Sequence, residues 1–185
     1  FNGVAGTTYV LRWTISNGVC TPSTDEVTIR LDQAPTVSNA GSDQVICGTS
    51  ATLGGNAAVI GTGSWAITAG AGGSVITPSS PTSPFTGVAG TTYTLTWTIS
   101  NGVCTSSTDN VQIQMDASPT VSVAGADQNI CGTSAVLGAN APTTGTGSWS
   151  IVSGAGGSFV LNTNPTTTFN GVAGTTYVLR WTISN

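Results

Sequence analysis

The eight residues Tyr93–Ser100 read Tyr-Thr-Leu-Thr-Trp-Thr-Ile-Ser and alternate large apolar side chains with small polar ones. Strict alternation of this kind is typical of a β-strand that buries one of its two faces. Asn101 and Gly102 follow directly, and this pair favours a two-residue type I′ turn because both residues tolerate a positive φ. The stretch therefore predicts a strand that leads into a tight hairpin.

The register of that hairpin would decide which side chains of the next strand are buried. A two-residue turn places Ile99 opposite Cys104, so the Cys104 sulfur is predicted to lie on the buried face. The next strand, Val111–Met115, buries odd-numbered positions, whereas continuing from Cys104 would bury even-numbered ones. One additional residue would correct the phase, so a β-bulge is predicted within residues 107–110.

The same stretch recurs along the chain with a fixed period. The segment FNGVAGTTYVLRWTISN at Phe1 returns with small changes at Phe85 and unchanged at Phe169, a spacing of 84 residues each time. The segments ICGTSATLGGN and GTGSWAI also have second copies at this spacing. A fixed period indicates a tandem array, and array ends normally carry distinct capping features. These ends carry none, so we expect a window from a longer array.

Each repeat is predicted to be a β-sandwich. Short β-prone runs are separated by Gly, Pro, Asn and Ser clusters, which makes about seven strands per period with turns every 8 to 12 residues, typical of an antiparallel sandwich. These runs are Thr36–Ser38, Val45–Ile46, Ala51–Leu53, Ser64–Ile67 and Ser74–Ile76. No stretch shows helical periodicity. We expect an all-β chain of sandwich repeats arranged end to end, divided into 1–32 (the end of a preceding repeat), 33–116 (complete) and 117–185 (the start and middle of the next).

The composition excludes several classes of function. Only 5% of the 185 residues are charged, His is absent, and the three cations are all arginines. Imidazole acid–base chemistry and lysine Schiff bases are therefore excluded. The net charge of −4 argues against nucleic-acid or anionic-lipid partners. No apolar run approaches the roughly 18 residues needed to cross a bilayer, so no direct membrane insertion is expected.

The four cysteines Cys20, Cys47, Cys104 and Cys131 occur twice per period and are interpreted as disulfides in an oxidising compartment. Cys47 with Cys104 would lie within one repeat, whereas Cys20 with Cys47 would bridge neighbouring repeats. Loop length separates these pairings by only about half a kcal/mol. The predicted inward position of Cys104 favours Cys47 with Cys104, with Cys20 and Cys131 paired outside the window. Two thiols per repeat without His disfavour a zinc site.

The carboxylates recur with the same period. Asp116 and Asp127 flank the boundary between the second and third repeats and are a weak candidate for a Ca²⁺ site. Calcium needs six to eight oxygen ligands, so we prefer Asx-turn and strand-end roles. Paired carboxylates can hydrolyse glycosides, but nothing in the sequence places two of them in one cleft. We therefore expect no catalytic residue, no cofactor and no enzymatic activity.

The five tryptophans occupy positions that the strand patterns turn inward. They are Trp13, Trp65, Trp97, Trp149 and Trp181. Inward tryptophans pack in a core, whereas sugar-binding platforms need exposed aromatic rings. The exposure of Trp65 or Trp97 therefore distinguishes a packed core from a carbohydrate-binding surface.

The segments AGSDQVICGTSATLGGN, GTGSWAI and GTTYTLTWTISNGVCTSSTDNVQI together resemble the Ig-like or PKD-like repeats of giant cell-surface proteins of Bacteroidota, including SprB-type gliding adhesins. The resemblance covers the whole chain. It implies export by the type IX secretion system and display on the outer membrane as long filaments that contact surfaces. It carries no ligand-binding residue onto this sequence.

Two functions follow as expectations. The first is a structural and adhesive repeat of an extracellular, cell-surface filament that serves attachment or gliding. Its partners would be neighbouring repeats of the same chain and other copies in the filament, with surface or polysaccharide ligands undefined. The second is a carbohydrate-binding array of a secreted polysaccharide-degrading protein.

Overall fold

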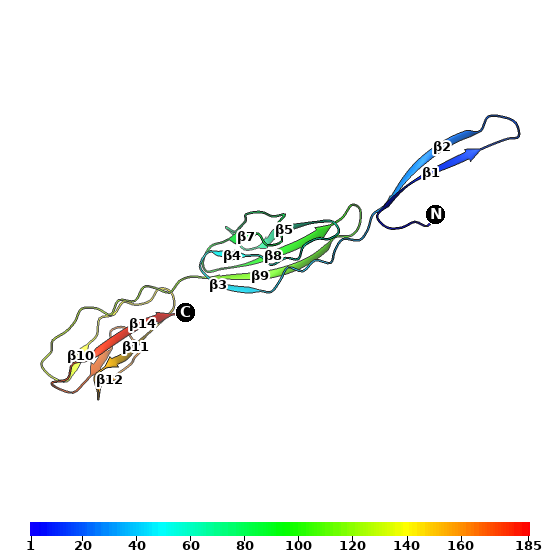
Figure 1. Cartoon of the computed structure of the whole chain (residues 1–185). Helices are drawn as coiled ribbons and strands as arrows, with labels where there is room; N and C mark the ends of the chain where they lie inside the picture. The colour runs from blue at the N-terminus through cyan, green and yellow to red at the C-terminus, as the bar shows by residue number, and fades with distance from the viewer. The chain divides into compact units, whose positions relative to one another are not determined.

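The computed structural model describes all residues from 1 to 185, which form 14 β-strands and no helix (Figure 1). The predicted all-β class is confirmed. The chain divides into two compact units, Phe1–Asp116 and Ala117–Asn185. The first unit holds a two-stranded hairpin and the complete repeat, and the second holds the third copy of the repeat as far as Asn185. No helix of a length and apolarity that would cross a membrane is present.

The complete repeat is a sandwich of two sheets (Figure 1). One sheet has the order β3-β9-β8-β5 and the other has the order β4-β7-β6. All neighbouring strands are antiparallel except β3 and β9, which are parallel. Two packed sheets with seven strands are the architecture of an Ig-like sandwich. The strands are β3 (Gln44–Cys47), β4 (Ser50–Thr52), β5 (Thr62–Ala69), β6 (Ser74–Val75), β7 (Pro84–Thr86), β8 (Thr91–Ser100) and β9 (Ser107–Asp116).

A pair of tryptophans occupies the centre of this sandwich. Trp65 of β5 and Trp97 of β8 are register partners, and their ring centroids lie 5.0 Å apart. They are only 4% and 1% exposed. Each buried indole N–H donates to a backbone carbonyl, Trp97 to Asn56 and Trp65 to Pro81, at 3.2 Å in both cases. The core therefore satisfies the polar atoms of its largest side chains, as burial requires.

Tyr93, at the start of β8, fixes the connection between the two sheets. Its hydroxyl accepts a hydrogen bond from the Val88 amide and donates one to the Ala71 carbonyl, both at 2.8 Å. A buried tyrosine that bonds the backbone a few residues upstream is the tyrosine corner of Ig-like domains. In the second unit Tyr177 makes the same contact with the Val172 amide at 3.0 Å. The corner is thus a property of the repeat.

The β8–β9 hairpin differs from the predicted one. Ile99 lies opposite Ser107 rather than Cys104, so the loop contains residues 101–106 instead of two. Gly102 has a φ of 54°, but Asn101 does not have a positive φ, which excludes a type I′ turn. The predicted two-residue turn is therefore wrong.

The predicted bulge in β9 is wrong as well. The β8–β9 register runs without interruption from Ile99 opposite Ser107 to Thr91 opposite Met115. The longer loop corrects the phase, so no extra residue is needed within the strand. A register shift lies instead between Ile67 and Ala69 of β5, where that strand pairs with β8.

Two short strands were also misassigned from sequence. Residues 36–38 form no strand; the Thr36 amide donates to the Ile60 carbonyl at 3.0 Å, a contact between the loop before β3 and the loop before β5. Strand β7 was not predicted, since it is three residues long and begins with Pro84. Its Phe85 is nevertheless fully buried between β4 and β6.

The first hairpin consists of β1 (Thr7–Ile15) and β2 (Ser23–Leu31), the copies of β8 and β9. The two strands form a sheet of their own. Trp13 is 72% exposed, whereas its copy Trp97 is 1% exposed in the complete repeat. The predicted inward position of Trp13 is therefore wrong for this hairpin, because no second sheet covers that face.

The second unit repeats the sandwich without a copy of β9. Its sheets have the orders β10-β13-β12 and β11-β14. Residues 128–131, the copy of β3, form no strand because β3 pairs only with β9. The strands are β10 (Ser134–Val136), β11 (Thr146–Ser153), β12 (Ser158–Phe159), β13 (Thr168–Asn170) and β14 (Val178–Ser184).

The close contact of Gly63 with Trp97 gives a first testable prediction. A Cβ added at Gly63 would overlap the Trp97 indole. We expect Gly63→Ala to lower the free energy of unfolding of the complete repeat by about 1–3 kcal/mol, as overpacking does. Urea unfolding followed by tryptophan fluorescence measures it. Gly54→Ala is the matched control, since its Cβ would meet only the Gly41 Cα at 4.0 Å. Equal midpoints for the two variants would contradict this account.

Candidate functional site at the repeat junction

The predicted disulfide between Cys47 and Cys104 conflicts with the strand register. Cys47 is the register partner of Asp116 at the carboxyl end of β9, whereas Cys104 precedes the amino end of β9 at Ser107. Ten residues of extended strand span about 30 Å. A disulfide needs Cα atoms roughly 4.4–6.8 Å apart. The intra-repeat pairing is therefore wrong, because β3 runs parallel to β9 and ends beside its last residue.

No disulfide is formed within this chain. The alternative pairing of Cys20 with Cys47 is not formed either. Cys20 lies in the loop between β1 and β2, where its amide donates to the Asn17 carbonyl at 3.2 Å. Cys20 and Cys104 thus occupy equivalent hairpin loops, and Cys47 and Cys131 occupy equivalent positions at the other end of the repeat.

The linker between the first hairpin and the complete repeat is held by side-chain hydrogen bonds. The Asp32 Oδ2 atom accepts a hydrogen bond from the Val103 amide at 3.1 Å. Asn101 Nδ2 donates to the Gln33 carbonyl at 2.8 Å. The Asp32 side chain is only 8% exposed, and Arg30 Nε lies 2.7 Å from its Oδ1 atom. Both linker residues are therefore tied to the loop between β8 and β9.

Gly102 is required at this junction by the approach of Asp32. A Cβ at position 102 would overlap the Asp32 carboxylate. Its φ of 54° also lies in the left-handed region that favours glycine. The Asn-Gly pair therefore serves the junction, with the amide of Asn101 holding the linker and the missing side chain of Gly102 admitting the carboxylate. Sequence reasoning missed this role because the same pair is the strongest local signal for a tight turn.

The Asn contact with the linker recurs one period later. In the second unit, Asn185 Nδ2 donates to the Ala117 carbonyl at 2.6 Å, as Asn101 does to Gln33. At the end of β9, Gln114 Nε2 donates to Asp116 Oδ1 at 2.8 Å, in the place where Arg30 meets Asp32. The recurrence of Asp and of Asn-Gly at a spacing of 84 residues is the sequence signal that points to this site.

The structure gives no cation-binding cluster around the weak calcium candidates Asp116 and Asp127. These residues belong to different units. Asp43, the copy of Asp127, accepts a hydrogen bond from the Gln112 amide at 2.8 Å. No group of three or more His, Cys, Asp or Glu side chains gathers anywhere in the structure. The known partners of these carboxylates are N–H donors, which fits strand-end roles, and the calcium site stays a prediction.

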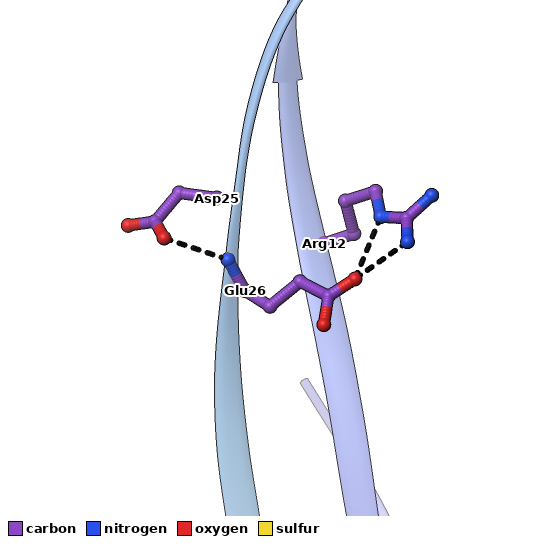
Figure 2. Close-up of polar contacts among 3 residues, drawn as sticks. All are labelled: Arg12, Asp25 and Glu26. Carbon is purple, nitrogen blue, oxygen red and sulfur yellow. Dashed lines mark hydrogen bonds and ion pairs between the residues drawn. The ribbon is translucent and has the colours of Figure 1, made fainter.

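The outer face of the first hairpin carries a cross-strand ion pair (Figure 2). Arg12 of β1 and Glu26 of β2 are register partners, and Arg12 Nε and Nη2 lie 2.8 and 2.6 Å from Glu26 Oε1. Asp25 Oδ1 accepts from the Glu26 amide at 2.9 Å (Figure 2). Both ion-pair side chains are about half exposed or more, so the pair contributes little stability. In the complete repeat the same positions are Thr96 and Asn110, which share a hydrogen bond of 2.6 Å.

The tryptophans that would distinguish a sugar-binding surface are buried. Trp65, Trp97, Trp149 and Trp181 are between 1% and 4% exposed. Trp13 alone is open to solvent, at a position that the complete repeat buries. These four rings therefore form cores and offer no stacking platform.

A cavity of about 500 Å³ opens in the second unit, lined by Trp149, Phe169, Gly171 and Tyr177 among others. In the complete repeat a Cβ added at Gly87, the copy of Gly171, would lie 2.7 Å from Met115 Sδ. Met115 of β9 thus fills the corresponding space there. In the complete repeat a strand occupies the equivalent space, which argues against interpreting the cavity as a ligand pocket.

Comparisons with known proteins give little further information. No family model matches the chain, and no curated protein matches it. Among solved structures, the chain is similar to the insect immune protein hemolin, at 13% sequence identity and with a TM-score of 0.44. The hemolin structure is described as showing a new domain arrangement with implications for homophilic adhesion. The match covers 93% of this chain and 54% of the hemolin chain.

The Asp32 contact gives a second prediction. We expect Asp32→Ala to raise the hydrogen-exchange rate of the Val103 amide by roughly ten- to hundred-fold, since a hydrogen bond to a charged acceptor contributes about 1.5–3 kcal/mol. Amide-resolved hydrogen exchange measures it. Asp25→Ala is the matched control, because its carboxylate bonds the neighbouring Glu26 amide within β2, away from the junction. Unchanged exchange at Val103 in Asp32→Ala would show that the junction contact is not formed.

Proposed function

We propose that this chain is a segment of a non-enzymatic structural and adhesive array that forms part of a long extracellular filament on a cell surface. The observation that carries the proposal is the junction, where Asp32 and Asn101 hold the linker against the next repeat. A linker fixed by side-chain hydrogen bonds restricts the orientation of one repeat relative to the next more than a flexible linker does. The main partners of each repeat are then its neighbours in the same chain.

The use of side chains within the repeat supports a non-enzymatic role. The carboxylates of Asp32, Asp43 and Asp109 accept backbone amides of Val103, Gln112 and Ala40, respectively. Groups employed in this way hold loops in place. With no His and a net charge of −4, the chain also offers no basic surface for nucleic acid.

The resemblance to Bacteroidota adhesin repeats supports the cellular setting of this proposal. It suggests export by the type IX secretion system, attachment at the outer membrane, and a role in surface attachment or gliding motility. The low charge and the near identity of successive copies fit a filament whose function depends on its length. Other copies in a filament are possible lateral partners, and the surfaces contacted are undefined.

The alternative function is a carbohydrate-binding array of a secreted polysaccharide-degrading protein. The burial of Trp65 and Trp97 counts against it, because sugar platforms need exposed rings. A glycan array probed with the whole chain tests this directly. We expect no saturable binding, and no effect of Trp13→Ala. Saturable binding that Trp13→Ala abolishes would favour the alternative.

A deletion tests the spacer function. Removing residues 33–116 joins Asp32 to Ala117 and keeps the repeat phase, since residue 117 is the copy of residue 33. We expect the maximum dimension measured by small-angle X-ray scattering to fall by roughly 35–45 Å, because a strand of ten residues is about 34 Å long and the loops at its ends add to that length. An unchanged maximum dimension would mean that repeats pack side by side, and it would overturn the spacer proposal.

A further inference from the structure

The two cysteines of a repeat lie at its two opposite ends. Cys104 is in the loop between β8 and β9, and Cys47 is the last residue of β3. The parallel pairing of β3 with β9 sets this separation, with Cys47 beside Asp116. Disulfides formed by these two cysteines must therefore be with cysteines of other repeats.

The loop cysteine lies next to the carboxylate at the junction. Val103, whose amide donates to Asp32 Oδ2 at 3.1 Å, directly precedes Cys104. The Cys104 amide bonds the Asn101 carbonyl at 3.1 Å, which closes the loop over the linker. Cys104 is therefore held near the last residue of the preceding repeat, and its side chain is partly buried there.

The strand cysteine lies next to the equivalent carboxylate. Asp116 is the copy of Asp32, and its Oδ1 is held by Gln114 as the Oδ1 of Asp32 is held by Arg30. Register partners on adjacent strands project their side chains to the same face of the sheet, so Cys47 and Asp116 point the same way. The sulfur of Cys47 thus lies beside the Asp116 carboxylate. The equivalent carboxylate of Asp32 accepts a hydrogen bond from the β8–β9 loop of the following repeat.

We infer that consecutive repeats are joined by a disulfide between the β3 cysteine of one repeat and the β8–β9 loop cysteine of the repeat that follows. Around Asp32, this pairs Cys104 with the copy of Cys47 that belongs to the preceding repeat. Around Asp116, it pairs Cys47 with the copy of Cys104 that belongs to the following repeat. Both positions lie beside one carboxylate, Cys47 as a register partner of Asp116 and Cys104 next to the residue that bonds Asp32. The inference requires their Cα atoms to lie within the roughly 4.4–6.8 Å that a disulfide spans.

The chemistry is an oxidation of two thiols. Each Sγ loses its proton, the two sulfurs together give up two electrons, and the S–S bond forms between them. A disulfide of the glutathione class accepts both electrons and both protons and leaves as two thiols. The disulfide adds a second covalent connection at each junction. The inference does not depend on which surface the array contacts, so it goes beyond the proposed function.

An extended chain tests the inference at the junction that the structure shows. A copy of residues 33–84 placed before Phe1 completes the first repeat and supplies the missing β3 cysteine, because residue 85 is the copy of residue 1. The protein is folded with oxidised and reduced glutathione, alkylated, and digested without reduction. Mass spectrometry then identifies the linked peptides. Acrylamide quenching of Trp13 reports whether the first repeat is complete, since Trp13 is 72% exposed in the hairpin alone.

We expect the added cysteine to be linked to Cys104 and to no other residue. Cys104→Ser should leave the added thiol open to alkylation, whereas Cys20→Ser should leave the link intact. In the chain of 185 residues, Cys104 should remain a thiol. A link between Cys104 and Cys47, or a Cys104 thiol that survives oxidation while Trp13 is shielded, would overturn the inference.

The second junction gives an independent readout if the first extension does not fold. A copy of residues 102–116 placed after Asn185 completes the third repeat and supplies a loop cysteine for Cys47. We expect Cys47 to be linked to this added cysteine, and Cys131→Ser to leave the link unchanged. A protein that carries this extension and retains both thiols after oxidation would also overturn the inference.

Discussion

The uninterrupted ladder between β8 and β9 is the interaction on which the rest of the repeat depends. It runs from Ile99 opposite Ser107 to Thr91 opposite Met115 and buries the odd-numbered apolar side chains of both strands. One edge of this pair binds β5 and thereby brings the two central tryptophans into contact, and the other edge binds β3. The loop that closes the pair reaches the linker before the repeat. A single register therefore sets the core, the place of the strand cysteine and the contact at the junction.

The second unit shows what this ladder contributes. It keeps the tryptophan pair and the tyrosine corner, yet Tyr177 and Leu179 are partly exposed where Tyr93 and Leu95 are fully buried. A cavity lies where β9 packs in the complete repeat. The sandwich is therefore closed by the β9 strand, even though that strand carries no aromatic side chain.

The sequence correctly predicted the features that depend on local alternation and on the repeat period. It misled where the structure of a segment depends on its contacts with distant parts of the chain. Alternation identified β8 and the buried positions of β9, and the period of 84 residues identified the repeat. The Asn-Gly pair misled because its local preference for a tight turn does not decide this loop. The first hairpin closes with the same loop length, Ile15 lying opposite Ser23, although nothing lies within 4 Å of a Cβ at Gly18. The cysteine pairing misled because the parallel direction of β3 leaves no trace in a four-residue strand.

Near-identical repeats cannot each carry a distinct active site, so selection on such an array acts on what every copy shares. Among the polar side chains that recur, Asn101 and its copy Asn185 hold the carbonyls of Gln33 and Ala117, and Asp32 holds the loop of the next repeat. A substitution at one of these positions, copied through an array, would change every junction at once. The outer strand faces tolerate exchange, as the replacement of Arg12 and Glu26 by Thr96 and Asn110 shows. The physical constraint on this sequence therefore lies between repeats as much as within them.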